Sequence, residues 1–303
     1  MSAKTLFDLL SYAAFRVFLR VMAILPLSVA AAAGVFLGGV FFALGIRKRF
    51  VTGNIMRAFP DKSLSEASLI ARRLYKNMGL SVVEFARMDA IDEAYVERHI
   101  SFEGLHRLDE ALRLGKGAVV LTAHFGNWEL LSAALGIRGY PLSAVARPLD
   151  NAYMNEFIST QRSRFGNRVI AKKNAIRPML EVLKKNSILG ILLDQRASRK
   201  EAVVTDFLGM PAPTNKGLAL TVMRTGSSVV PVFIHREHGL KHRLVCMEPV
   251  PIAVTGDMER DIRENTQRFT SAIESFVRLY PDEWFWFHSR WERRKRSRHA
   301  KSK

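Results

Sequence analysis

The histidine and glutamate of the segment His124-Phe-Gly-Asn-Trp-Glu129 are residue types that can move a proton together. A carboxylate bonded to one imidazole nitrogen fixes the tautomer and makes the other nitrogen a better base. Five residues along one helix rotate the chain by about 500°, so on a single helix these side chains would point to different faces. We therefore expect a strand to end at His124, the chain to turn at Gly126, and a helix to start near Trp128.

The sequence before His124 agrees with this arrangement. Residues Ala118 to Ala123 are mostly apolar and rich in β-branched side chains, which is typical of a buried strand. The spacing alone is weak evidence, because eight histidines among frequent acidic residues can produce it by chance. We expect Glu129 to orient His124, which acts as the general base, and the backbone amides of the turn to stabilise a developing oxyanion.

Apolar runs and helical stretches alternate along the rest of the chain. Ser63-Leu-Ser-Glu66 has the spacing of a capping box and predicts a helix to about residue 88. The predicted strands are 118–123, 142–146, 188–193 and 229–234, and the predicted helices are 128–137, 151–165, 175–186, 215–225 and 258–280. This alternation favours an α/β fold with a mostly parallel central sheet flanked by helices. In such sheets chemistry gathers beyond the carboxyl ends of the strands, where His124 falls.

The N-terminal part contains an uncharged run from Val21 to Ile46. It exceeds the roughly 20 apolar residues that a membrane-spanning helix needs, even allowing for a bend at Pro26. It continues into Arg47-Lys48-Arg49, unlike a cleaved signal peptide. We expect an N-terminal membrane-anchoring helix, with the main domain on the cytoplasmic side because it follows the basic cluster. A buried core helix and a helix lying in the membrane interface are the alternatives.

The domain organisation follows from this run and from the absence of internal repeats and of long Pro/Gly/Ser-rich linkers. We expect an anchor at residues 1–50, one catalytic domain at 51–295 and a basic tail at 296–303. A single cysteine, Cys246, excludes an internal disulfide.

The charge balance of the chain is strongly basic. Against 28 Asp and Glu there are 46 Lys and Arg, which leaves a net charge of +18. Such a field attracts polyanions, among them nucleic acid, anionic lipid headgroups, phosphorylated substrates and acidic carrier proteins, and does not choose between them. No recognition-helix, RNA-binding or zinc-finger signature is visible, so nucleic acid is not the expected partner.

The string HFGNWE after an apolar strand resembles the late acyltransferases of lipid A biosynthesis, the lauroyl- and myristoyl-transferase family of the lysophospholipid acyltransferase-like superfamily. Several other blocks resemble this family in the same order. They are Asn54–Pro60, Ala146–Asn151, Arg162–Gly166, Leu193–Gln195, Asp206–Thr214 and the aromatic ending Glu283–Trp291. The resemblance extends from about residue 15 to residue 294.

This resemblance implies a fatty-acyl transfer from acyl carrier protein to a hydroxyl of a lipid A precursor, at the cytoplasmic face of the inner membrane. His124 would take the hydroxyl proton and Glu129 would stabilise its charged form; neither a metal nor another cofactor is expected. Arg147 and Arg164 suit an anionic glycolipid, because guanidinium binds phosphate and carboxylate in a bidentate way. Asp194 could hold Arg164 or a substrate hydroxyl, and Asn127 is a further candidate for substrate binding or for the shape of the loop.

Two other interpretations remain open at this point. One is a related membrane acyltransferase that acts on a lysophospholipid or a glycolipid, and the other is a non-catalytic basic membrane-binding protein.

The aromatic ending, with Trp284, Trp286 and Trp291, is expected to pack in the core or at a membrane interface. The pocket for the acyl chain is expected near Phe207 to Pro213.

Overall fold

A computed structural model describes residues 2–291, and the predicted basic tail at 296–303 lies outside the described residues. The strands are β1 (Ile100–Glu103), β2 (Ala118–Thr122), β3 (Leu142–Ala146), β4 (Arg168–Ala171), β5 (Ile188–Leu192), β6 (Ala202–Phe207), β7 (Met210–Asn215), β8 (Ser228–His238) and β9 (Lys241–Cys246). Seven of them form one sheet in the order β1-β9-β8-β2-β5-β3-β4, whereas β6 and β7 form a separate hairpin. Only the β8–β9 pair is antiparallel in the large sheet, so the predicted mostly parallel sheet is confirmed.

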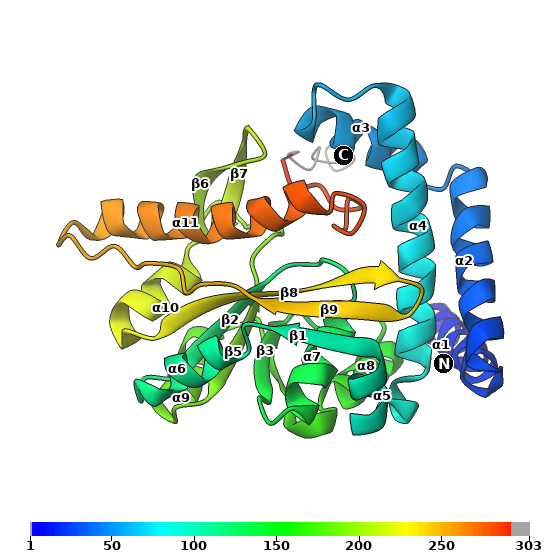
Figure 1. The fold of residues 1–303 in the computed structure, drawn as a ribbon, viewed down its shortest axis with the longest axis horizontal. Coiled ribbons are helices and arrows are strands. Elements are labelled where there is room, and N and C mark those ends of the chain that lie inside the picture. Colours follow the sequence, from blue (N-terminus) through cyan, green and yellow to red (C-terminus); the bar gives the residue numbers. More distant parts are fainter. Residues whose placement is uncertain (1, 292–303) are drawn as a thin grey trace.

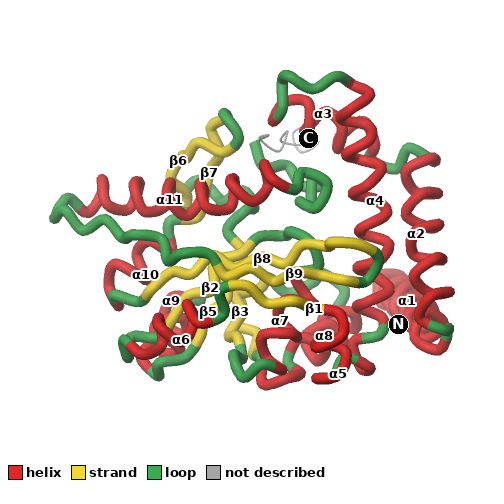
Figure 2. Tube along the Cα trace, in the orientation of Figure 1, coloured by secondary structure: helices red, strands yellow, loops and turns green. Residues whose placement is uncertain are grey.

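Helices cover both faces of this sheet and extend beyond one end of it (Figures 1 and 2). They are α1 (Ala3–Ile24), α2 (Leu27–Ala43), α3 (Lys48–Ala58), α4 (Leu64–Ala86), α5 (Glu93–His99), α6 (His106–Arg113), α7 (Trp128–Ile137), α8 (Ala152–Arg162), α9 (Ile176–Lys184), α10 (Gly217–Thr225) and α11 (Met258–Leu279). Two short 3₁₀ helices, Met88–Ala90 and Arg164–Gly166, complete the list. The predicted helices and strands are present at their expected positions, and the capping box at Ser63 and Glu66 starts α4.

The core explains why the central strands are apolar on both faces. Val119 and Leu121 of β2 belong to one cluster, packed with α9, α10 and α11. Ala118 and Val120 belong to the other cluster, packed with α6 and α7. Because successive side chains of a strand point to opposite faces, a strand between two helical layers must be hydrophobic throughout.

The N-terminal apolar run forms two helices and not the single anchoring helix that we expected. α1 ends at Ile24 and α2 begins at Leu27, because Pro26 lacks the N–H that a continuous helix requires. The Arg87 guanidinium, at the end of α4, donates to the carbonyl groups of Met22, Ala23 and Leu25 over 2.7 to 3.1 Å. These bonds satisfy carbonyls that the end of α1 leaves without helical partners.

One face of α2 packs on α4 through glycine. A Cβ at Gly34 would lie 2.7 Å from the carbonyl oxygen of Gly79, and a Cβ at Gly38 would lie 2.2 Å from that of Tyr75. Both glycines are therefore required for the close approach of the two helices. The other face of α2 is exposed and apolar, and Phe36 there is 69% exposed.

The described residues contain no single helix that is both long enough and apolar enough to cross a membrane. α2 and α3 meet these criteria only as a pair, and the pair is bent by 87°.

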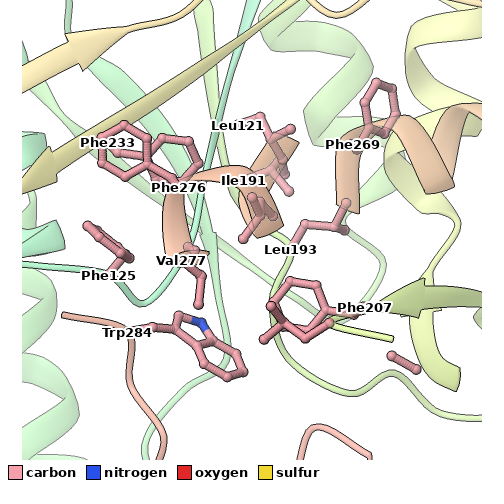
Figure 3. Packing of buried hydrophobic residues seen from close by; sticks show 14 of the residues in the cluster. Leu121, Phe125, Ile191, Leu193, Phe207, Phe233, Phe269, Phe276, Val277 and Trp284 are labelled. Carbon is pink, nitrogen blue, oxygen red and sulfur yellow. The ribbon is translucent and has the colours of Figure 1, made fainter. Parts of the chain in front are cut away.

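The aromatic C-terminal segment closes the core beside the end of β2 (Figure 3). Trp284 and Trp286 are buried, as expected for packing residues. Trp284 lies against Phe207, with ring centroids 5.2 Å apart, and Phe125 lies against Phe276 at the same separation. The segment also bonds to the turn that follows β2, since Gly126 N donates to Glu283 O and Phe285 N donates to His124 O.

A buried ionic cluster joins α4 to the sheet. The carboxylate of Glu84 accepts from Arg236 at 2.7 and 2.8 Å and lies 2.7 Å from Nε2 of His242. It also accepts from Nδ2 of Asn127 at 2.8 Å. Burial disfavours the charged carboxylate, but the charges and hydrogen bonds of His242 and Arg236 outweigh burial and lower the pKa of Glu84 to about 2.

We expect Glu84→Gln to destabilise the fold by about 3–5 kcal/mol, because it leaves Arg236 buried without its counter-charge. Urea unfolding of the variant and of wild type measures this difference. Glu110→Gln, on the exposed face of α6, is the matched control and should change the free energy of unfolding little.

Since the pKa of Glu84 is lowered on folding, the contribution of Glu84 to the free energy of unfolding is present above pH 4.5 and is lost as the pH falls toward 2. Equal stability of both variants would show that the cluster contributes nothing.

Candidate active site

His124 and Asp194 lie side by side because two parallel strands end together. Thr122 of β2 pairs with Leu192 of β5, and each functional residue lies two positions beyond its strand. The imidazole Nδ1 of His124 is 2.9 Å from Oδ1 of Asp194. This pair stands beyond the carboxyl ends of the strands, where open α/β sheets place their chemistry.

Asp194 is held by several further groups. Its Oδ2 accepts from the backbone N–H of His124 at 3.0 Å and from the indole Nε1 of Trp284 at 2.9 Å. Nε2 of His288 lies 3.6 Å from the same oxygen. The carboxyl group is fully buried, whereas the side chain of His124 is 23% exposed. The carboxylate is thus fixed, and the imidazole reaches the surface.

The electrostatics of the pair favour an ionised Asp194. Burial disfavours its charge, but the charge and hydrogen bond of His124, with a smaller effect of His288, hold the pKa of Asp194 well below its ordinary value. A carboxylate can only accept, so the proton between the two groups belongs to Nδ1 of His124. Nε2 therefore carries the lone pair of the neutral imidazole.

The pKa of His124 shifts upward. Burial favours its neutral form, but the charge and hydrogen bond of Asp194, joined by the charge of Glu129, outweigh burial and raise the pKa of His124 above its ordinary value. The imidazole is therefore a stronger base than a histidine in water.

The turn after His124 has the predicted geometry. Gly126 has a φ of +55°, and a Cβ there would lie 1.9 Å from the carbonyl oxygen of Ile234. Only glycine fits such a position. Helix α7 then begins at Trp128, as expected.

Asn127 is the N-cap of α7. Its Oδ1 accepts from Leu130 N at 3.1 Å, and its Nδ2 donates to Glu84. The side chain is buried, and these contacts give it a role in the shape of the loop.

Glu129 does not make the hydrogen bond to His124 that we expected. Its carboxylate accepts from Nε and Nη2 of Arg162 at 2.5 to 3.1 Å and from Nε1 of Trp128 at 3.0 Å. Nδ1 of His124 bonds to Asp194 instead. The carboxylate therefore comes from the end of β5, which is adjacent to β2 in the sheet, and not from α7, which follows His124 in the sequence. Glu129 still influences His124 through its charge, which raises the pKa of that histidine.

The two arginines expected to bind substrate lie in different places. Arg147 lines the cavity at the site and pairs with Asp150 at 2.7 Å, both side chains being exposed. Arg164 pairs with Asp89 instead of Asp194. A further arginine at the site is Arg162, which bonds to Glu129 and which the sequence marks only as a member of the same block as Arg164.

A cavity of about 1820 Å³ opens beside His124 and Glu129. Its apolar lining comes from β2, β3, β5 and the helices around them, and includes Val120, Leu131, Leu142, Met179, Ile191 and Leu218. Its basic lining includes Arg147, Arg162, Arg168, Lys172, Arg199 and Lys216. Residues 207–213, where we expected the acyl-chain pocket, are not in this lining, and Phe207 is buried against Trp284. Among residues 2–291, no three His, Cys, Asp or Glu side chains are grouped to hold a metal ion.

Comparison with known proteins identifies the family. The family model for bacterial lipid A biosynthesis acyltransferases matches residues 1–293. The chain belongs to this family. It is 23% identical over 253 residues to the lipid A biosynthesis palmitoleoyltransferase of Escherichia coli K12, which covers 82% of this chain and 79% of that protein.

Two other relatives show the range of names among similar proteins. The lipid A biosynthesis acyltransferase of Haemophilus influenzae is 22% identical over 235 residues, or 77% of this chain and 72% of that protein. The phosphatidylinositol mannoside acyltransferase of Mycobacterium tuberculosis H37Rv is 26% identical over 216 residues, or 69% and 66% of the two chains.

The acyltransferase therefore has a fixed, ionised carboxylate, a histidine with one free lone pair, and a cavity with apolar and basic walls. Such a site can remove a proton from a hydroxyl group and hold an amphiphilic substrate beside it. Sequence reasoning missed the contact between His124 and Asp194. It also missed the hydrogen bonds of Arg162 to Glu129 and of Trp284 to Asp194. The signal was the block Leu193-Asp-Gln195, which follows a buried strand as His124 does.

Proposed function

We propose that this acyltransferase moves a fatty-acyl chain from the thioester of acyl carrier protein to a hydroxyl of a lipid A precursor. The observation that carries the proposal is the His124–Asp194 pair at the mouth of a cavity with both apolar and cationic walls. Apolar walls suit acyl chains, and cations suit the phosphates of a glycolipid or an acidic carrier.

His124 acts as the general base in the proposed reaction. Nε2 takes the proton of the acceptor hydroxyl as its oxygen attacks the thioester carbonyl carbon. Asp194 holds Nδ1–H and stabilises the imidazolium that forms. The tetrahedral intermediate then collapses, the carbon–sulfur bond breaks, and the imidazolium returns the proton to the leaving thiolate. No acyl-enzyme is needed in this sequence.

Glu129 and Arg162 have a supporting role in the proposal. The bidentate contact with Glu129 keeps the guanidinium of Arg162 in the cavity wall. The charges of both residues influence the pKa of His124. We infer that Glu129 positions Arg162 for an anionic group of the substrate, and that it acts on His124 by charge and not by a hydrogen bond.

We expect Arg147→Ala to raise the Michaelis constant for the acceptor several-fold and Arg164→Ala to leave it nearly unchanged. Arg147 lines the cavity, whereas Arg164 is paired with Asp89 outside the lining. Lysine at 147 should rescue only partly, because an ammonium makes no planar two-point contact. Steady-state kinetics of the Ala and Lys variants at two salt concentrations measure this, since an ionic contact weakens at high salt. An effect at 164 equal to that at 147 would contradict the assignment.

The identity of the acceptor is the part of the proposal that the relatives define least. Their names include both lipid A and phosphatidylinositol mannoside acyltransferases, so another glycolipid is the second candidate. Mass spectrometry of lipid A from cells that lack and then regain the gene distinguishes them. Loss and return of one acyl chain on lipid A supports the proposal, and unchanged lipid A contradicts it.

We propose that residues 1–50 attach the enzyme to the inner membrane and leave the catalytic domain, residues 51–295, on the cytoplasmic side. Exposed apolar side chains on α1, on α2 and at the end of α2 support the attachment, among them Phe7, Leu10, Val17, Phe36 and Leu44. The free energy gained by burying such side chains in lipid exceeds the free energy of electrostatic attraction to the membrane surface.

Membrane fractions washed with carbonate or high salt test this attachment. We expect the enzyme to stay with the membrane in both washes and Phe36→Asp with Leu44→Asp to weaken retention. Release of wild type by salt alone would make the attachment electrostatic.

A further inference from the structure

The side chain of Gln195 forms a hydrogen bond with Nε2 of His124, the nitrogen that would act as the base. Its amide Nε2 lies 3.3 Å from Nε2 of the imidazole, the nitrogen that Asp194 leaves free. The imidazole nitrogen is an acceptor there, so the amide N–H donates to it. Gln195 is exposed and lines the cavity, which brings it to the place where a substrate must enter.

The backbone beneath Gln195 is fixed while its side chain faces the cavity. Arg290 is fully buried and donates to the carbonyl oxygen of Gln195 at 3.2 Å. The same guanidinium donates to Pro213 O at 3.0 Å and to Thr214 Oγ1 at 2.6 Å. Ala197 N donates to Pro213 O. The main chain from the carbonyl of Gln195 to Ala197 is therefore tied to the β6–β7 hairpin, while the side chain of Gln195 lines the cavity.

Several backbone amides of the turn, where we expected an oxyanion to be stabilised, already donate to other groups. His124 N donates to Asp194, Phe125 N to a carbonyl, Gly126 N to another, and Leu130 N to the cap of α7. A committed N–H adds little to the stabilisation of a new anion. The side-chain amide of Gln195 differs from them because it bonds to the imidazole nitrogen that the acceptor hydroxyl must reach in the proposed reaction.

We propose that Gln195 is a catalytic residue that protects the lone pair of His124 in the free enzyme and then donates its N–H to the thioester carbonyl oxygen. The inference rests on the acyl transfer proposed above. When the acceptor hydroxyl takes its place at Nε2, the amide stands one hydrogen bond from the attacking oxygen, beside the carbonyl under attack. As the carbon–oxygen bond forms, the carbonyl electron pair moves to oxygen and His124 takes the proton. On collapse the pair returns, the thiolate leaves, and the proton passes to it.

Kinetics of Gln195→Ala and Gln195→Glu with acyl carrier protein thioester and lipid A precursor test this role. We expect Gln195→Ala to lower kcat by about 10²-fold, the order of one oxyanion donor, with a small change in KM. Gln195→Glu should lose as much or more, because its carboxylate cannot donate and repels the developing anion. Gln267→Ala, on α11, removes an amide that bonds only to Ser271 and the backbone of Asp206 and is the matched control.

The pKa of His124, followed by NMR of its ring, gives a second readout that needs no turnover. Donation to the neutral imidazole favours that form, so Gln195→Ala should raise this pKa. The charged groups that act on His124 are Asp194, Glu129 and Arg162, and His288 acts on Asp194; all four are unchanged in the variant. A shift in this direction together with the loss of kcat supports the proposal.

Other outcomes separate this inference from the proposed function. Wild type that acylates neither lipid A precursor nor another glycolipid contradicts the proposed function and the role of Gln195 with it. An active wild type with Gln195→Ala within twofold of its kcat overturns only the role of Gln195. A rise in KM alone overturns it as well, since a residue that binds only the ground state does not act on the oxyanion.

Discussion

His124→Ala is expected to lower turnover by about 10²- to 10⁴-fold, the range for loss of a general base. The physical reason is that, in the proposed mechanism, the lone pair of Nε2 accepts the proton of the acceptor hydroxyl, while Nδ1 is held by a buried carboxylate. The measurement is acyl transfer by purified variants, with folding checked by circular dichroism. His238→Ala, at the exposed end of β8, is the matched control and should retain wild-type turnover. A folded His124→Ala enzyme with normal turnover would exclude the mechanism.

The pH profile of wild type gives an independent check on the same residue. A base must be deprotonated to act, so kcat/KM should rise with pH through the pKa of His124. Because that pKa is raised on folding, the midpoint should lie above about 6.5, the ordinary value for histidine. A midpoint below that value would contradict the assignment of Asp194 as the partner of the imidazole.

Asp194→Asn is expected to lower turnover on the order of 10²- to 10⁴-fold while leaving the cavity intact. A neutral amide does not stabilise the imidazolium, and it can present an N–H to Nδ1, which moves the imidazole proton to Nε2. The pKa of His124 should fall at the same time, because the charge of Asp194 is what raises it most. A merely structural role would leave that pKa unchanged.

The control for Asp194→Asn is Asp206→Asn on the exposed edge of β6, where the carboxylate bonds only the turn at Gly209. Thermal unfolding of both variants separates lost chemistry from lost stability, since Asp194 also accepts from Trp284. If Glu129→Ala removed activity and Asp194→Asn did not, the contact first expected from the HFGNWE segment would be the functional one after all.

Local pattern alone determined a large part of this protein. The apolar β-branched run before His124, the glycine at 126 and the helix start at Trp128 lie within a dozen residues, and each has a local cause. The parallel sheet follows from the alternation of such units, because parallel neighbours require a crossover that a helix supplies. The order of motif blocks predicted the family, which the match over residues 1–293 confirms.

The N-terminal run shows where composition is insufficient. Its length and lack of charge predict one spanning helix, yet Pro26 divides it, and Gly34 and Gly38 bring α2 against α4. Hydropathy averages over the run, whereas the backbone responds to a single missing N–H and to two missing Cβ atoms.

The partners at the site were decided by tertiary structure. Glu129 is five residues from His124 and Asp194 is seventy, yet Asp194 holds the imidazole because β2 and β5 are neighbours in the sheet. Arg162 then takes Glu129 from α8, thirty-three residues away. Sequence distance limits only contacts within one helix or turn, whereas strand adjacency depends on how the whole chain packs its apolar faces. Residue types and local turns were therefore readable in the sequence, and the pairing of charges became visible only in the fold.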